Sequence, residues 1–188
     1  MSDAQDTQGL PSKQETALAD PPICVKIPVV IGQNSCEVMV VTEIPTPSLY
    51  EIKDINETVS VTNCLVQTNL VIINVVLHKD INYKQVTDTI SYDTNLTAFT
   101  GPVVASTTDL PFHCFMDIPG ALPGDDCQVE SASVIGEKDE LINPNSSNSP
   151  TTFDSLMEKA VIQVVVKVTR TQQVTVSSLT PSVCPPSP

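Results

Sequence analysis

Residues 59–86 read VSVTNCLVQTNLVIINVVLHKDINYKQV, a run rich in β-branched residues that contains neither proline nor glycine. Such a composition suits a pleated, half-buried surface better than a helix. Alternate residues of an extended chain share a face, and between residues 70 and 77 both faces are largely apolar. A strand that is apolar on both faces is usually central in its sheet and covered on both sides. We therefore predict a central strand within this run.

A second strong strand pattern lies near the other end of the chain, where residues 160–169 read AVIQVVVKVT. Apolar residues recur there with a period of two, which predicts a strand with one mostly solvent-facing side. Shorter strands are expected before, between and after these two. They are separated by predicted turns at residues 32–35 and 45–47 and by a loop insertion at 137–158, with a helical turn near 153–159. The expected fold is all-β, an antiparallel or mixed β sandwich or barrel-like single domain with flexible N- and C-terminal arms.

Composition divides the chain into three parts. Residues 1–22 are polar and acidic, so we expect a disordered N-terminal arm. Residues 23–178 carry the strand patterns and form the predicted β domain. Residues 179–188 are rich in proline and form a predicted C-terminal tail.

The charge of the chain argues against several functions. Its 22 acidic and 9 basic side chains give a net charge of −13. Nucleic acids and anionic membrane surfaces are both bound through basic residues, so neither is an expected partner. No segment approaches the roughly 18 to 20 consecutive apolar residues of a membrane span. The first 20 residues show no secretory signal, so we expect the chain to be made in a cytoplasm.

The chain contains six cysteines: Cys24, Cys36, Cys64, Cys114, Cys127 and Cys184. None of their spacings gives a C-x-x-C pair, so a zinc site is not indicated. The four inner cysteines are interpreted as buried core thiols, or as partners for a cysteine of another chain; the competing account is that all six cysteines stay reduced or pair within one chain. Cys24 and Cys184 lie instead at the two junctions between core and tail, where a thiol can meet a neighbouring chain.

The sequence offers few residues for catalysis. His113 and Cys114 are neighbours on a predicted strand and therefore point to opposite faces, so they cannot form a thiol–imidazole pair. The segment 78–80, His-Lys-Asp, is interpreted as a solvated turn at a strand end. The best candidates for a cation site are Asp117, Asp125 and Asp126, although a polar hairpin explains them equally well. We expect no enzyme activity, no cofactor and no bound metal.

Five separated motifs resemble the SPOCS domain of bacterial sporulation and spore-envelope proteins. They are IPVVIG at 27–32, KDI at 53–55, VVLHKDINY at 75–83, LPFHCFMDIPGA at 110–121 and VVVKVT at 164–169. The resemblance implies a β-rich, non-enzymatic building unit of the spore surface. It implies synthesis in the mother-cell cytoplasm and deposition on the spore.

Two functions are compatible with these patterns. The first is a structural subunit that assembles with copies of itself, into a filament or appendage or into an exosporium or coat layer. Its subunits would be joined by strand addition, with Ile23–Val30 or Val174–Val183 as the donated strand, and locked by disulfides from Cys24 or Cys184. The alternative is a non-catalytic adaptor that recruits other spore coat or cortex proteins.

Overall fold

The computed structural model describes residues 23–93, 96–147 and 150–176. Their secondary structure consists of strands, and no helix occurs in these ranges. The strands are β1 (Ile23–Gln67), β2 (Leu70–Gln85), β3 (Asp88–Asp93), β4 (Leu96–Thr100), β5 (Val103–Asp117), β6 (Asp126–Asn145) and β7 (Thr152–Val176). The all-β prediction is therefore confirmed. The predicted arms, 1–22 and 179–188, lie outside the described residues.

Five strands form one open sheet in the order β5-β2-β1-β7-β6, and β3 pairs with β4 in a separate two-stranded sheet. The described pairings of β1 with β2, β2 with β5 and β6 with β7 are antiparallel. The five-stranded sheet is not closed into a barrel, because β5 and β6 are its two edges. Pro28–Thr171 is one compact unit, and Ile23–Ile27 and Gln172–Val176 are the described part of a second.

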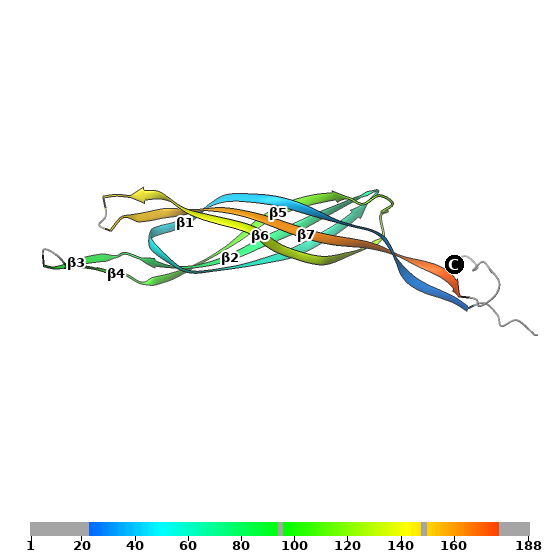
Figure 1. Cartoon of the computed structure of the whole chain (residues 1–188), viewed down its shortest axis with the longest axis horizontal. Coiled ribbons are helices and arrows are strands. Elements are labelled where there is room, and N and C mark those ends of the chain that lie inside the picture. The colour runs from blue at the N-terminus through cyan, green and yellow to red at the C-terminus, as the bar shows by residue number, and fades with distance from the viewer. Residues whose placement is uncertain (1–22, 94–95, 148–149, 177–188) are drawn as a thin grey trace, which may run out of the picture. The chain divides into compact units, whose positions relative to one another are not determined.

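The long strand β1 reverses its direction within the larger unit, as the blue-to-cyan part of Figure 1 shows. Before the reversal β1 lies along β7, where the Gln163 amide donates to Glu37 (3.0 Å) and the Ser48 amide N–H donates to Asp154 (3.1 Å). After it, residues 49–67 pair with β2. The predicted break at residues 45–47 marks this corner, where Ser48 has a positive φ of 55°. One strand thus belongs to both layers of a folded sheet.

The predicted turn at residues 32–35 is wrong, because β1 continues through it. Gly32 serves a close approach instead of a turn. A Cβ placed there would lie 2.7 Å from Cγ2 of Ile118, which is buried. Glycine is the residue that permits two segments to meet this closely.

The predicted loop insertion at 137–158 is also wrong for most of its length, as is the helical turn near 153–159. β6 runs to Asn145 and β7 begins at Thr152, with their last pair at Asn145↔Thr152. The polar composition of this segment suggested a loop, but a backbone hydrogen-bond ladder does not require apolar side chains.

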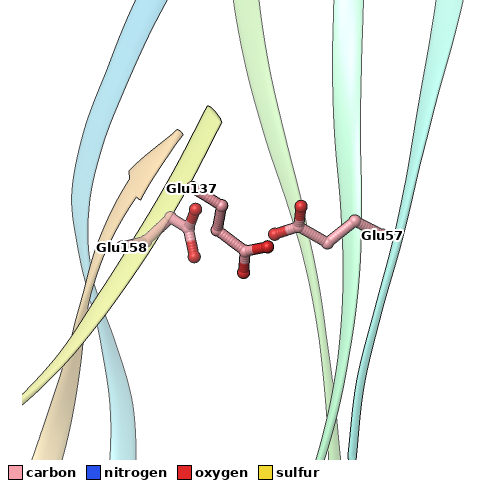
Figure 2. A group of neighbouring side chains, drawn as sticks. All are labelled: Glu57, Glu137 and Glu158. Carbon is pink, nitrogen blue, oxygen red and sulfur yellow. The ribbon is translucent and has the colours of Figure 1, made fainter. Parts of the chain in front are cut away.

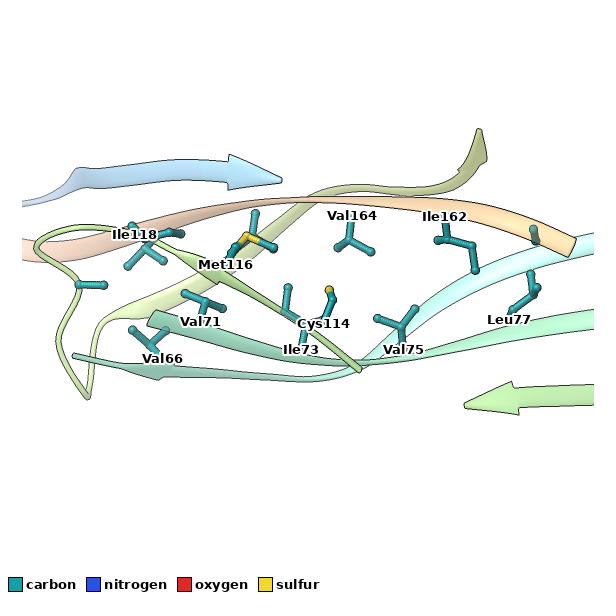
Figure 3. Close-up of a cluster of buried hydrophobic side chains, with 14 residues drawn as sticks. Val66, Val71, Ile73, Val75, Leu77, Cys114, Met116, Ile118, Ile162 and Val164 are labelled. Carbon is teal, nitrogen blue, oxygen red and sulfur yellow. The ribbon is translucent and has the colours of Figure 1, made fainter. Parts of the chain in front are cut away.

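The core lies between the inward faces of the two layers, β2 and β5 on one side and β7 on the other (Figure 3). The alternation predicted for residues 160–169 is confirmed, since Ile162, Val166 and Val168 are fully buried. The prediction that the central strand is covered on both faces is wrong. On β2, Ile73 is fully buried, whereas its neighbour Ile72 is only half-buried, because only one face meets the opposite layer.

Candidate functional site

A lysine occupies an inward-facing position on β2. Leu77, Lys79 and Ile81 alternate along the buried face of this strand, and the side chain of Lys79 is 0% exposed. The backbone alternation therefore places an ammonium group inside the molecule. The prediction that residues 78–80 form a solvated turn is wrong, because β2 extends through them to Gln85.

Four carboxylates from three other strands surround this ammonium group. The Lys79 Nζ donates to Glu57 on β1 (2.8 Å), to Glu137 on β6 (3.0 Å) and to both oxygens of Asp139 on β6 (3.0 and 3.1 Å). It also donates to Glu158 on β7. We call these five residues the Lys79 cluster. Figure 2 shows the carboxylates of its three glutamates converging from β1, β6 and β7.

Burial differs among the carboxylates of the Lys79 cluster. The side chain of Glu158 is 0% exposed, whereas those of Glu57, Asp139 and Glu137 are 10%, 15% and 36% exposed. Within the described residues, Oε1 of Glu158 is buried without a hydrogen-bond partner, although its Oε2 accepts from Lys79. An unpaired buried oxygen is unfavourable, since it has lost its water contacts without replacement.

The pKa values of the Lys79 cluster reflect the burial and the close spacing of its charged groups. Burial raises the pKa of Glu158 to about 7, and the nearby carboxylate of Asp139 adds to the rise. Burial also raises the pKa of Glu137. Burial alone would lower the pKa of Lys79, but its hydrogen bonds to the carboxylates outweigh that effect and raise it. The ammonium therefore stays charged, and the carboxylates around it are in excess.

A cleft of about 620 Å³ opens beside the Lys79 cluster. It lies between β1 and the edge strand β6, and is lined by residues 57–59 and by five residues between Ala132 and Glu137. We call it the β1–β6 cleft. Glu57 and Glu137 belong both to its lining and to the Lys79 cluster, so the cleft reaches the cluster from outside.

Two disulfides join distant strands. Cys36 of β1 is bonded to Cys114 of β5, with a Cα–Cα distance of 6.4 Å. Cys64 of β1 is bonded to Cys127 of β6, with a Cα–Cα distance of 6.3 Å. The interpretation of these four residues as thiols does not hold in this structure, because the strand topology brings them together in pairs.

The other predicted site residues fall in different environments. Cys24 takes part in a disulfide, and Cys184 lies outside the described residues. The three aspartates do not form one site, because Asp125 is paired with the Arg170 guanidinium (2.6 and 2.7 Å). Asp117 and Asp126 are exposed.

Sequence reasoning missed the whole Lys79 cluster, since its members are separated by up to about a hundred positions. A local signal existed for two of them. Lys79 interrupts the series of inward-facing apolar residues on β2. Glu158 interrupts the corresponding series on β7, which runs from Leu156 to Val168. A charged residue at an inward position of a strand indicates a buried ion pair.

The arrangement defines a disulfide-linked, antiparallel β protein with a buried ion cluster. Residues 49–134 match the family model described as SipL, SPOCS domain. The match supports a SPOCS-domain protein, and the matched stretch contains three of the five motifs noted in the sequence. SPOCS is a non-catalytic family associated with sporulation, so the match points to a sporulation-related role.

No curated protein and no solved structure matches the chain. In the part of the chain that the structure describes, there is no helix of the length and hydrophobicity that a membrane crossing requires.

Proposed function

We propose that this chain is a structural subunit of the bacterial spore surface that assembles with copies of itself. The assembly is a filament or appendage, or a layer of the exosporium or coat. Neighbouring subunits are joined by addition of strands to an open sheet edge. The single observation that carries this proposal is the open sheet with β5 and β6 as its edges.

Both edges combine backbone hydrogen-bonding groups with exposed apolar side chains. Phe115 on β5 is 71% exposed, and Ile135 and Val129 on β6 are 49% and 41% exposed. An apolar hollow of about 360 Å³ lies beside Phe115 and includes Ile72 in its lining. An edge of this kind is a template for pairing with another chain.

Pairing between different surfaces of identical subunits produces open polymers when the rotation does not close a ring. The candidate donor strands are Ile23–Val30 and Val174–Val183. The described part of each is already extended, as the beginning of β1 and the end of β7. An extended segment loses little conformational freedom when it joins a neighbouring sheet.

Cross-linking through Cys24 and Cys184 is part of the proposal. The four core cysteines form two disulfides, Cys36–Cys114 and Cys64–Cys127, and therefore offer no thiol to a neighbour. Cys24 is also bonded, so a link between subunits through it replaces that disulfide. The attacking thiolate comes from a neighbouring copy in which Cys24 or Cys184 is still reduced; it attacks the disulfide of Cys24, and the former partner of Cys24 leaves as a thiolate. The exchange itself is redox-neutral, and the new disulfide persists in surroundings that are less reducing than the cytoplasm.

Negative-stain electron microscopy of the purified chain tests the proposal. We expect ordered polymers from the wild type and loss of polymers from Phe115→Glu or Ile135→Glu, since a charge at an edge opposes pairing. Tyr92→Glu is the matched control, because Tyr92 is 65% exposed but lies on the separate β3–β4 sheet. Polymers from all three variants would contradict joining at these edges. A wild type that stays monomeric under every condition would favour the adaptor function.

The double variant Cys24→Ser/Cys184→Ser tests the cross-link separately. We expect its polymers to form but to dissociate in hot detergent, whereas wild-type polymers persist. Equal resistance of the two would show that these cysteines do not join subunits.

A further inference from the structure

The Lys79 cluster contains more negative than positive charge. When its four carboxylates are ionised, one ammonium leaves an excess of three negative charges among side chains that are mostly buried. Carboxylates held this close repel one another strongly unless a proton or further positive charge enters. The cluster therefore attracts a cation in addition to Lys79.

The spacing of the three glutamates fits a calcium ion. One oxygen from each of Glu57, Glu137 and Glu158 lies within 4.8 Å of the other two. Calcium binds oxygen ligands at about 2.3 to 2.6 Å, so two of its ligands lie at most about 5 Å apart. Magnesium binds at about 2.0 to 2.1 Å in a strict octahedron and usually keeps several of its waters, so a set of protein carboxylates suits calcium better.

A second observation points to a ligand at this place. Oε1 of Glu158 has no hydrogen-bond partner among the described residues, although the side chain is completely buried. The carboxylate faces the other two glutamates in Figure 2. A bound cation would give this oxygen the partner that the surrounding protein groups do not provide.

Binding requires Lys79 to give up its hydrogen bonds to the three glutamates. Its ammonium is also held by both oxygens of Asp139 at 3.0 and 3.1 Å, so Lys79 would keep this pair while the glutamates turn to the ion. Lys79 and a divalent cation together bring three positive charges to the four carboxylates. The β1–β6 cleft reaches Glu57 and Glu137, and provides an entry path and space for water ligands.

We propose that Glu57, Glu137 and Glu158 form a binding site for a divalent cation of calcium's size and ligand preference, beside the Lys79–Asp139 pair. The site joins three strands, because its ligands come from β1, β6 and β7. Calcium then stabilises the closed arrangement of the two layers.

Isothermal titration calorimetry of the full, oxidised chain with calcium chloride, after removal of bound metals by a chelator, tests the site. We expect binding by the wild type, weaker binding of magnesium, and at least about tenfold weaker calcium binding by Glu57→Gln and Glu137→Gln. These two side chains are partly exposed, so both variants should fold. Glu158→Gln should lose binding.

The double variant Asp117→Asn/Asp126→Asn is the matched control and should bind calcium as the wild type does. Lys79→Met should bind at least as tightly as the wild type, because it removes a positive charge next to the ion. No binding by the wild type up to about 10 mM, beyond the range of even weak calcium sites, would overturn the proposal. Unchanged binding by the glutamine variants, or loss of binding only in the control, would also overturn it.

Discussion

Replacing Lys79 by methionine removes the only ammonium of the Lys79 cluster and keeps most of the apolar length of the side chain. Glu158, which is fully buried, then loses its charged partner. Glu57, Asp139 and Glu137 are partly exposed and can regain some water contact. The main penalty therefore arises at Glu158.

Removal of one partner from a buried ion pair typically costs about 3 to 5 kcal/mol. This is a large part of the roughly 5 to 15 kcal/mol by which a domain is stable. At about 2 to 4 °C per kcal/mol for a chain of this size, we expect the melting temperature to fall by about 6 to 20 °C.

Urea denaturation of the oxidised protein in the presence of a calcium chelator measures this loss as a lower midpoint at an unchanged slope. Lys138→Met is the matched control, because Lys138 also pairs with a glutamate but its side chain is 69% exposed. An exposed pair contributes about 0 to 1 kcal/mol. The double variant Lys79→Met/Glu158→Gln should recover part of the stability, since it leaves no unpaired buried charge at that position.

A loss below about 1 kcal/mol for Lys79→Met, equal to that of the control, would refute this reasoning. It would mean that the carboxylates reach solvent and do not depend on the ammonium. Failure of the double variant to recover any stability would place the cost in packing instead of charge.

Other predictions concern the disulfides, one surface ion pair and the core. Replacing Cys36 and Cys114 by alanine opens a loop of 78 residues and should lower the free energy of unfolding by about 4.5 kcal/mol in the chain-entropy model; a urea midpoint equal to the wild type's would contradict this. The hydrogen bond from Arg170 lowers the pKa of Asp125, so this contribution to stability is complete above the unfolded pKa of about 3.9 and is lost as the pH falls through the lower folded value. The stability difference between wild type and Arg170→Gln should therefore shrink below pH of about 4, and a difference independent of pH would exclude the pair as its source. Ile73→Ala should cost about 2 to 5 kcal/mol by calorimetry, because Ile73 is fully buried; a smaller loss would show that the core refills the space.

Local patterns predicted the strands that bury one continuous face. The alternation in residues 160–169 is visible to a reader of the sequence, because each residue's face depends only on its position in the strand. In residues 70–77 both faces are largely apolar, so the sequence predicted the strand but not which of its faces is buried. The predicted strand boundaries were wrong where a polar or glycine-containing segment suggested a turn or loop but the backbone is paired as a strand. Gly32 suggested a turn, yet it lies in a strand, where the absence of a Cβ leaves room for Ile118.

The Lys79 cluster and the disulfide pairs could not be predicted from local patterns. Four cysteines allow three pairings, and the strand order decides among them. Glu57 and Glu158 meet only because β1 contributes to both layers. Lys79 and Glu158 each gave a local signal, as a charge among inward-facing apolar residues.

The crossing of the two disulfides changes what a single break of the backbone can do. Cys36 is joined to Cys114, and Cys64 is joined to Cys127, so the two closed loops overlap along the chain. After a protease cuts one peptide bond anywhere between Cys36 and Cys127, at least one disulfide still connects the two pieces. The β3–β4 hairpin lies inside this interval, so its exposed strands can be nicked without release of a fragment. A nicked molecule therefore runs as one band on a non-reducing denaturing gel and as two bands after reduction. In a polymer, both pieces of a nicked subunit stay covalently linked to each other.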